Sequence, residues 1–370
     1  MSAAGGDLDK ARARIDALDQ QLQKLIAERA RVALEIRAIK AAAGDGNGKG
    51  NDHYRPAREA EVLRRAIARN RDLKGPLSDE VMARLMREVM SACLALESPL
   101  AVSYLGPEGT YTQAAVYKHF GHQVNARVAI AIDEIFRDVE SGSATYGVVP
   151  IENSTEGVVS STLDGLASTP LAICGEVWLP VHHHLLSRHK RREDIRKVYA
   201  HAQSFAQCRK WLDDKLPHAE RVAVASNGLA AQQVRKSGKG AAIAGQAAAE
   251  LYKLNTLASN IEDDPNNTTR FLVIGRQNPE PTGRDMTSLV MSAHKNRSGA
   301  LFALLEPFSK AGISLTKIES RPSRRAAWDY NFFIDLEGHQ SDEGVKPALD
   351  LVRSRAAYFR ILGSYPRAVV

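Results

Sequence analysis

Several charged side chains in the first hundred residues lie where the surrounding pattern is apolar. Residues 8–40 carry apolar residues at the a and d positions of a heptad repeat, but one of these positions is Arg29. A guanidinium in an apolar seam costs several kcal/mol unless a counter-charge meets it there. Arg12 and Lys40 occupy equivalent e positions, so they flank the same seam toward its two ends. The pattern therefore predicts that something anionic binds beside Arg29.

Two further segments place charges at the margins of apolar stripes. Arg58 and Glu59 begin the stripe of the segment that follows Pro56, and Glu97 ends the stripe of the segment that follows Ser78. Proline suits the first turn of a helix and serine its N-cap, which predicts three helices and no strand in this part. An interhelical ion-pair network in a coiled-coil dimer would explain the charges equally well. The three helices are expected at about 8–40, 56–69 and 79–97.

The central part of the chain, residues 101–278, contains polar turns beside buried apolar runs. One group of polar side chains follows the run VVPI, and another precedes FLVIG. A glycine turn in LGPEGTYTQAA leaves backbone N–H groups at a helix start that could hold a carboxylate. Locally, each turn is also explained as an N-capped helix start or a polar loop. The polar side chains are Glu152, Asn153, Ser154, Thr155, Thr268, Thr269 and Arg270.

Short β-rich runs alternate with helical stretches in this central part, which predicts an α/β sheet domain. No Gly-Lys-Ser or Gly-Lys-Thr closes the glycine turn, and its glycines lack the dinucleotide fingerprint, so the pattern argues against nucleotide binding. His182, His183 and His184 do not predict a metal site, because adjacent side chains in an extended run point to opposite faces.

The C-terminal part has a different order of elements. After a polar stretch with Pro279, Pro281 and Gly283, residues 286–370 show strand, helix, strand, strand and a final helical segment. This order is typical of a small α+β domain of the ferredoxin-like type.

The composition indicates a globular protein of two or three domains. Of 370 residues, 44% are hydrophobic and 25% charged. No run of 18 apolar residues and no signal-peptide pattern is present, so we expect a cytoplasmic protein without a membrane partner. The net charge of +7 comes from 50 basic and 43 acidic residues that are interleaved. An anionic small molecule explains this excess without nucleic acid, and the three distant cysteines predict no disulfide framework.

The first part resembles the all-helical, intertwined chorismate mutase family through RIDALDQQLQKLIAERARVALEI, YRPAREAEVLRR and SACLALE. The resemblance implies a mutase domain over residues 1–98 whose active site is shared between two subunits. It implies that Arg29 and Arg58 bind substrate carboxylates together with Arg12 of the partner subunit. No metal or cofactor is implied, because the rearrangement of chorismate is one concerted step.

The same resemblance assigns three more residues. Lys40 would donate to the ether oxygen of chorismate, Glu59 would receive its hydroxyl, and Glu97 would take the second position at the ether oxygen. Some relatives have glutamine in place of Glu97, and a glutamate can donate only while it is protonated. Mutase activity is therefore expected to fall as the pH rises. The glycine-rich run 41–53 lengthens the loop after Lys40.

The polar turns of the central part, together with VYAHAQSFAQCRKWL, resemble the prephenate dehydratase family. The resemblance implies two α/β lobes hinged around a cleft, as in periplasmic binding proteins. It implies that Thr269 assists departure of the ring hydroxyl and that Arg270 binds a substrate carboxylate. Ala200 stands where many relatives have serine, so its side chain takes no part. The residues implied to bind substrate are Asn153, Ser154, Thr155, His201, Gln207, Thr268, Arg270 and Phe271.

The C-terminal part resembles the amino-acid-sensing ACT domain that is fused to prephenate dehydratases. The match lies over residues 286–339 and implies that L-phenylalanine binds between paired domains. A module that only dimerises the chain is the alternative. The residues implied to bind phenylalanine are Gly299, Ala300, Leu301, Glu319, Ser320, Arg321 and Pro322.

The three resemblances together imply an enzyme of phenylalanine biosynthesis with two activities. It would rearrange chorismate to prephenate and convert prephenate to phenylpyruvate, under inhibition by L-phenylalanine. At least a homodimer is expected, because the mutase sites share Arg12. A ligand sensor without catalysis, or an enzyme that retains only the dehydratase, would fit the same domain order.

Overall fold

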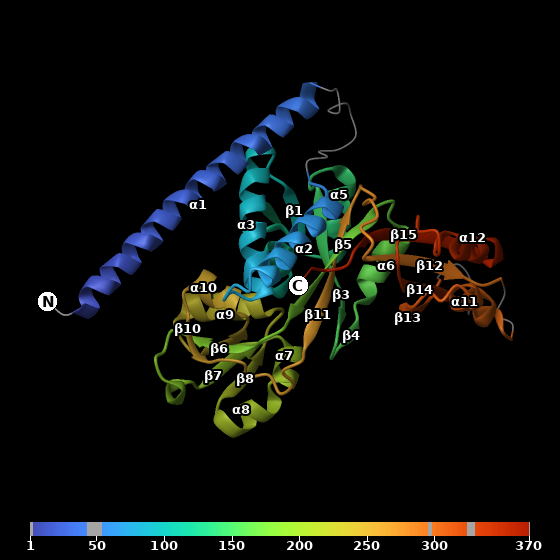
Figure 1. Cartoon of the computed structure of the whole chain (residues 1–370). Helices are drawn as coiled ribbons and strands as arrows, with labels where there is room; N and C mark the ends of the chain where they lie inside the picture. Colours follow the sequence, from blue (N-terminus) through green and yellow to red (C-terminus); the bar gives the residue numbers. More distant parts are fainter. Residues whose placement is uncertain (1–2, 43–53, 295–297, 324–329, 370) are drawn as a thin grey trace.

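The computed structural model describes residues 3–42, 54–294, 298–323 and 330–369, and positions 43–53 of the glycine-rich run lie outside them. Three parts follow one another along the chain (Figure 1): a helical module, a two-lobed α/β part and a small α+β domain. This order confirms the predicted multi-domain fold class.

The helical module consists of α1 (Ala3–Ala42), α2 (Pro56–Asp72) and α3 (Asp79–Glu97). Pro56 occupies the first turn of α2, and the Ser78 hydroxyl caps α3 by accepting a hydrogen bond from the Val81 N–H. Between α2 and α3, Leu63, Ile67 and Ala83 form a small apolar core. No strand occurs in the described part of this module, as predicted.

Helix α1 leaves most of its apolar seam uncovered in a single chain. Leu8, Ile15, Leu18, Leu22 and Leu25 are between 52% and 63% exposed, and this end of α1 projects away from the rest of the molecule (Figure 1). The later part of α1 contacts α3. A heptad seam of this length is the surface that a coiled-coil type of dimer buries.

The first lobe of the α/β part is a six-stranded sheet with the order β2-β1-β3-β11-β5, and β4 pairs with β3. Strand β11 returns from the second lobe and runs antiparallel to both β3 and β5. Its elements are β1 (Ala101–Leu105), α4 (Tyr111–Phe120), β2 (Asn125–Ala129), α5 (Ile132–Ser141), β3 (Tyr146–Asn153), β4 (Gly157–Val158), α6 (Ser160–Ser168), β5 (Ala172–Pro180) and β11 (Thr268–Gly275).

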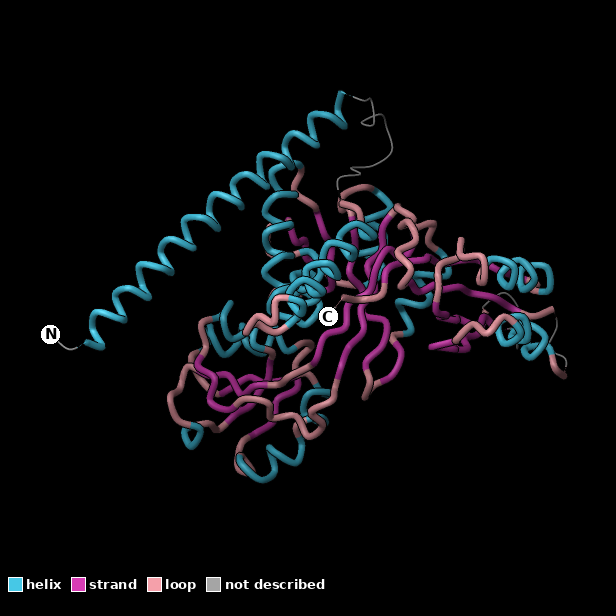
Figure 2. The backbone as a smooth tube through the Cα atoms, in the orientation of Figure 1, coloured by secondary structure: helices cyan, strands magenta, loops and turns pink. Residues whose placement is uncertain are grey.

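The second lobe is a five-stranded sheet with the order β10-β6-β9-β7-β8. It forms the lower lobe of strands and helices in Figure 2. Two crossings, at residues 181–183 and 259–267, join the lobes, so each lobe can move about the pair of connections. Its elements are β6 (His184–Ser187), η1 (Arg192–Asp194), β7 (Lys197–Ala200), α7 (Ala202–Gln207), α8 (Arg209–Lys215), β8 (Glu220–Ala223), α9 (Asn227–Ser237), β9 (Ala241–Ala244), α10 (Gln246–Tyr252) and β10 (Asn255–Ala258).

The C-terminal domain is an antiparallel sheet with the order β13-β14-β12-β15 and two helices, which confirms the predicted ferredoxin-like fold. The sequence pattern did not predict its last strand, because Arg360 and Gly363 break the apolar run of that segment. The elements are β12 (Asp285–Ser292), α11 (Ala300–Lys310), β13 (Leu315–Pro322), β14 (Tyr330–Glu337), α12 (Lys346–Arg355) and β15 (Tyr358–Pro366).

The first lobe and the C-terminal domain share one apolar core. Ile173 and Leu272 of the lobe pack in the same cluster as Phe333 and Leu362 of the C-terminal domain. At Gly363 the backbone of β15 approaches β5 so closely that a Cβ atom would lie 2.3 Å from the Ile173 carbonyl oxygen. The two domains are therefore packed as one body along this contact.

Within the described part of the chain, none of the helices combines the length and the apolar character needed to cross a membrane.

Candidate functional site

The junction of the two lobes brings together two of the predicted residues. Asn153 at the end of β3 and Thr269 on β11 are register partners, and Asn153 Nδ2 donates to Thr269 Oγ1 at 2.8 Å. The other amide atom, Asn153 Oδ1, accepts from the backbone N–H groups of Thr155 and Glu156 at 3.0 and 3.1 Å. This turn fixes the orientation of the amide, so that its NH2 group faces Thr269.

A chain of hydrogen bonds continues from this pair into the second lobe. Asn153 Nδ2 also donates to Asn267 Oδ1 at 2.8 Å, and Asn267 Nδ2 donates to Gln207 Oε1 at 3.1 Å. Gln207 Nε2 in turn donates to Glu156 Oε1 at 3.2 Å. Gln207 lies at the end of α7 in the second lobe. It is therefore bonded to Glu156 of the first lobe and to Asn267 of the connection between the lobes. These contacts hold the lobes against one another in this structure.

His183, in the crossing between the lobes, forms the inner end of this chain. Its Nε2 lies 2.7 Å from Gln207 Oε1 and its Nδ1 lies 2.9 Å from the Tyr111 hydroxyl. Burial lowers the pKa of His183, so its imidazole is neutral at neutral pH. Burial also raises the pKa of Tyr111 well above its usual range, which keeps that phenol protonated. His183 and Tyr111 therefore act as neutral donors and acceptors in the site.

Glu262 supports the same crossing. It accepts from the His183 N–H at 2.8 Å and from His182 Nδ1 at 2.8 Å. Burial acts to raise the pKa of Glu262, but the bonds from His182 and His183 outweigh it and lower that pKa, so the carboxylate is ionised. His182 and His183 thus orient the crossing through hydrogen bonds. Among the described residues, no group of three or more His, Cys, Asp or Glu side chains is arranged to hold a metal ion.

The geometry favours Thr269 as a hydrogen-bond donor. Asn153 donates into Thr269 Oγ1, which leaves the hydroxyl hydrogen to be donated to another oxygen. A neutral hydroxyl held in this way can bond an oxygen on which negative charge develops. Charge on a departing hydroxide is one such case.

Three further residues of the predicted substrate set make their contacts within the chain. Arg270 is 4% exposed and is paired with Glu176 and Asp335, because alternation along β11 turns it to the opposite face from Thr269. Thr268 borders the space beside Arg270. Phe271 is 1% exposed and belongs to an apolar core of the first lobe. Alternation along β11 places it on the same side as Thr269, but its ring is packed inside that core.

The remaining predicted residues of this part border the lobe junction. The Ser154 hydroxyl accepts from the Thr268 N–H at 3.0 Å, and exposed Thr155 contributes its N–H to the turn around Asn153. His201 caps α7, and its own N–H is held by the Asn227 side chain at 2.9 Å. Their contacts indicate roles in shaping the turn and the helix start.

Sequence reasoning missed four residues of the junction: Tyr111, Glu156, His183 and Asn267. The dipeptide Asn266-Asn267 stands directly before the TTRF run, and this proximity was an available signal for Asn267. Nothing local to Tyr111 or His183 indicates that Tyr111 meets His183 or that His183 meets Gln207, because these contacts depend on how the lobes close.

The predicted mutase residues occupy separate places in a single chain. Arg29 on α1 is half-buried and its Nη1 lies 3.5 Å from the Val89 carbonyl oxygen on α3. Arg58 pairs with Glu61 at 2.6 Å, and Arg12 is exposed near Asp9. Glu97 is the last residue of α3. Lys40 lies in α1, but its side chain is outside the described part.

Glu59 lies in a pocket apart from α1 in a single chain. Its pocket is bordered by Arg87 of α3, His119 of α4 and Val177 of β5, and no described residue of α1 lines it. Burial raises the pKa of Glu59 to about 7, although Arg87 and the Tyr54 hydroxyl act in the other direction. The pKa of His119 is lowered to about 3 by burial. Within one chain, Glu59 therefore belongs to the contact between the helical module and the first lobe.

The raised pKa of Glu59 makes stability depend on pH. An unfolded glutamate titrates near pH 4.3, so between about pH 4.3 and 7 the folded chain holds a proton that the unfolded chain has released. The free energy of unfolding should therefore fall as the pH rises through this window. We expect Glu59→Gln to remove this fall, as measured by urea midpoints between pH 5 and 8.

Glu61→Gln is the matched control for that measurement. Hydrogen bonding to Arg58 lowers the pKa of exposed Glu61, so its removal should leave the fall between pH 5 and 7 in place. An unchanged pH profile in Glu59→Gln would assign the effect to another group.

The predicted effector residues lie at two places in the C-terminal domain. Gly299 caps α11 with φ of 78°, and Ala300 and Leu301 open that helix. Glu319, Ser320 and Pro322 lie on β13, the edge strand of the sheet.

Arg321 is engaged differently from the expectation. It donates to Asp164 of α6 through a two-oxygen contact at 2.9 and 3.0 Å, and to the Ser160 hydroxyl at 2.6 Å. In this single chain, the guanidinium of Arg321 is therefore bound to the first lobe.

Comparisons with known proteins agree with these three parts. Residues 11–98 match the family model of chorismate mutase type II, residues 102–279 that of prephenate dehydratase and residues 287–350 that of the ACT domain. A protein of Stutzerimonas stutzeri described as a bifunctional chorismate mutase/prephenate dehydratase is 52% identical over 360 residues, which cover 97% of each chain. A protein of Aquifex aeolicus with the same description is 40% identical and covers 98% of this chain and 99% of its own.

A solved structure is similar over the last two parts. It is a prephenate dehydratase from Arthrobacter aurescens in complex with L-Phe, with a TM-score of 0.68 and 34% identity. The similarity covers 73% of this chain and 93% of the other.

Proposed function

The chain belongs to the family of bifunctional chorismate mutase/prephenate dehydratases, and we propose that it converts chorismate to phenylpyruvate in two steps under inhibition by L-phenylalanine. The observation that carries the dehydratase assignment is the bond from Asn153 to Thr269 at the junction of the lobes. We also propose a cytoplasmic homodimer as the working form.

In the dehydratase step, the ring carboxylate of prephenate leaves as carbon dioxide. Its bonding electrons enter the ring, and the hydroxyl opposite leaves with its electron pair, which makes the ring aromatic. Thr269 donates a hydrogen bond to the departing oxygen, oriented by the amide of Asn153. Gln207 and Asn267 close the second lobe over the substrate. Since Arg270 is held in an ion-pair network, backbone N–H groups and neutral side chains at the junction receive the substrate carboxylates.

In the mutase step, the ether C–O bond breaks as a C–C bond forms, and no nucleophile is needed. Cations that hold the substrate carboxylates and donors at the ether oxygen lower the barrier. Arg29, Arg58, Lys40 and Glu97 supply these groups, together with Arg12 of the partner subunit. The exposed seam of α1 supports this arrangement, because a second α1 would cover it.

L-Phenylalanine is the proposed effector of the C-terminal domain, at Gly299, Ala300, Leu301 and the edge strand β13. A related dehydratase was solved with L-Phe bound, which supports this choice. An effector inhibits only if it binds the inactive arrangement better than the active one. By the same linkage, a bound prephenate analogue should weaken the binding of phenylalanine.

One assay tests all three parts at once. Purified protein is given chorismate or prephenate separately, with and without L-phenylalanine, and the ultraviolet absorption of phenylpyruvate is followed. We expect product from both substrates and suppression by phenylalanine. Product from prephenate alone would contradict the mutase assignment, and product from neither would favour a ligand sensor.

A further inference from the structure

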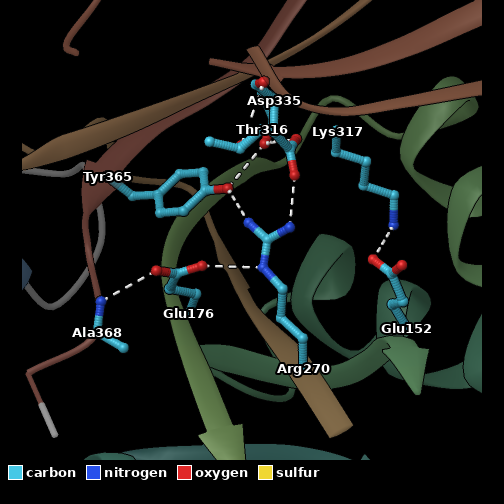
Figure 3. A network of polar contacts seen from close by, with 9 residues as sticks. Glu152, Glu176, Arg270, Thr316, Lys317, Asp335, Tyr365 and Ala368 are labelled. Carbon is cyan, nitrogen blue, oxygen red and sulfur yellow. Dashed lines mark hydrogen bonds and ion pairs between the residues drawn. The ribbon is translucent and has the colours of Figure 1, made fainter. Parts of the chain in front are cut away.

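Four charged residues join the sheet of the first lobe to the sheet of the C-terminal domain. Glu152 and Arg270 are register partners on β3 and β11, and Lys317 and Asp335 are register partners on β13 and β14. Lys317 Nζ lies 2.6 Å from Glu152 Oε2, and Arg270 Nη1 bonds Asp335 Oδ2 (Figure 3). We call these four residues the charge cluster. Two ion pairs thus join the strands β3 and β11 of the first lobe to the strands β13 and β14 of the C-terminal domain.

The charge cluster lies one residue along the chain from Asn153 and Thr269, which we call the catalytic pair. Glu152 precedes Asn153 on β3, and Arg270 follows Thr269 on β11. Adjacent residues of a strand face opposite sides of the sheet, so one side carries Asn153 with Thr269 and the other carries the charges. A force on these side chains therefore acts on the same backbone that carries the catalytic pair.

The ladder between β3 and β11 is irregular at this position. The register of β3 and β11 shifts directly after Arg270, where Phe271 pairs with Pro150 and Ile151 is left over. A bulge loosens the ladder, and proline has no N–H to donate to it. Contacts with the C-terminal sheet consequently help to fix where Glu152 and Arg270 stand.

The two ion pairs of the cluster differ in their surroundings. Arg270 also donates to Glu176 and to the Tyr365 hydroxyl, and its side chain is 5% exposed (Figure 3). Loss of a partner from such a buried network would damage the contact between the domains as a whole. The Lys317 and Glu152 side chains are 12% and 39% exposed, so this pair can be changed with less cost to folding.

Strand β13 connects this pair to the proposed effector site. Lys317 lies on the same strand as Glu319 and Ser320, two residues of the proposed phenylalanine site. Because β13 is the edge strand, its backbone pairs with a neighbouring strand on one side only in the described chain. A ligand that shifts β13 would displace Lys317 directly.

We propose that Lys317 and Glu152 are positioning residues that carry the state of the effector site to the catalytic pair. A shift of β13 moves Lys317, Lys317 moves Glu152, and Glu152 changes the bond between Asn153 and Thr269. The proposal rests on the proposed function, because it assigns a route to the inhibition by phenylalanine. A chain of contacts is a spatial argument, so it requires a test of coupling between the two residues.

The test compares wild type with Lys317→Met and Glu152→Gln, using prephenate turnover and calorimetric binding of L-phenylalanine. Allosteric coupling is typically 5- to 150-fold, so we expect activity at saturating phenylalanine to rise about tenfold in either variant relative to wild type. The Kd of phenylalanine should change less than about threefold. Without phenylalanine, kcat should fall about threefold at a nearly constant KM, because the catalytic pair is less well placed.

Two further variants separate a link from general damage. The double variant Glu152→Lys with Lys317→Glu reverses the ion pair and should restore inhibition to within about threefold of wild type. Lys310→Met is the matched control, since Lys310 pairs with Glu306 on the surface of the same domain at 2.7 Å. It should leave turnover and inhibition unchanged. Wild-type inhibition in Lys317→Met, or equal losses in Lys317→Met and Lys310→Met, would overturn the proposal.

Hydrogen–deuterium exchange of residues 152–156 supplies a readout that does not depend on turnover. We expect phenylalanine to change exchange there in wild type and to leave it unchanged in Lys317→Met. If wild type fails to turn over prephenate but shows this difference, the proposed function fails while the link stands. If exchange responds equally in both proteins, the link is refuted even when the enzyme is active and inhibited.

Discussion

Replacing Thr269 by valine is expected to lower kcat for prephenate by about 10²- to 10⁴-fold, the usual contribution of a positioned proton donor. Valine keeps the shape of threonine but removes the hydroxyl that Asn153 orients at 2.8 Å. The affinity for substrate should change much less, because the hydroxyl acts on the departing oxygen. Single-turnover formation of phenylpyruvate measures this directly.

Thr268→Val is the matched control for that experiment. Thr268 is the preceding residue of β11, and its hydroxyl donates to the Asn266 carbonyl oxygen at 3.3 Å on the other side of the strand. The same chemical change is made one position away, so damage to the strand should affect both variants alike. Equal losses in the two variants would show that the Thr269 hydroxyl has no special part.

Removing the guanidinium in Arg29→Ala should lower mutase activity by about 10²- to 10³-fold, the typical effect of losing one electrostatic stabiliser. The reason is the position of Arg29 in an otherwise apolar seam, where its charge needs an anion. Dehydratase activity should persist, because the junction of the lobes is built without α1. The two activities are measured on the same preparation with chorismate and with prephenate.

Arg31→Ala controls for the loss of an arginine from α1. Arg31 is exposed and lies two residues along the helix, about 200° around its axis from Arg29. Its removal should leave both activities near wild type. If mutase activity is as high in Arg29→Ala as in Arg31→Ala, Arg29 does not bind substrate. Its role would then be that of an interhelical ion-pair partner.

The sequence predicted the architecture well where periodicity was strong. The heptad of α1 and the buried runs of β3 and β11 were found, whereas the exposed edge strand β2, with the sequence NARVA, was missed. Such a strand owes its conformation to its pairing with β1, which no local pattern records.

The candidate site was only partly predictable for similar reasons. The resemblance pointed to Asn153 and Thr269, and the structure makes them register partners across 116 residues of sequence. For Arg270, the alternation of side chains along a strand was a signal that it faces away from Thr269. That it meets Asp335 depends on how two domains pack, which its local sequence does not encode.

The uncovered seam of α1 has a consequence for how the two activities respond to enzyme concentration. The residues of the proposed dehydratase site come from one chain, so we expect its rate to be proportional to the amount of protein. A mutase site that borrows Arg12 from a second chain obeys mass action, and below the dimer dissociation constant its rate falls with the square of the concentration. Dilution would then uncouple the two steps. The ratio of the mutase rate to the dehydratase rate would then depend on the enzyme concentration.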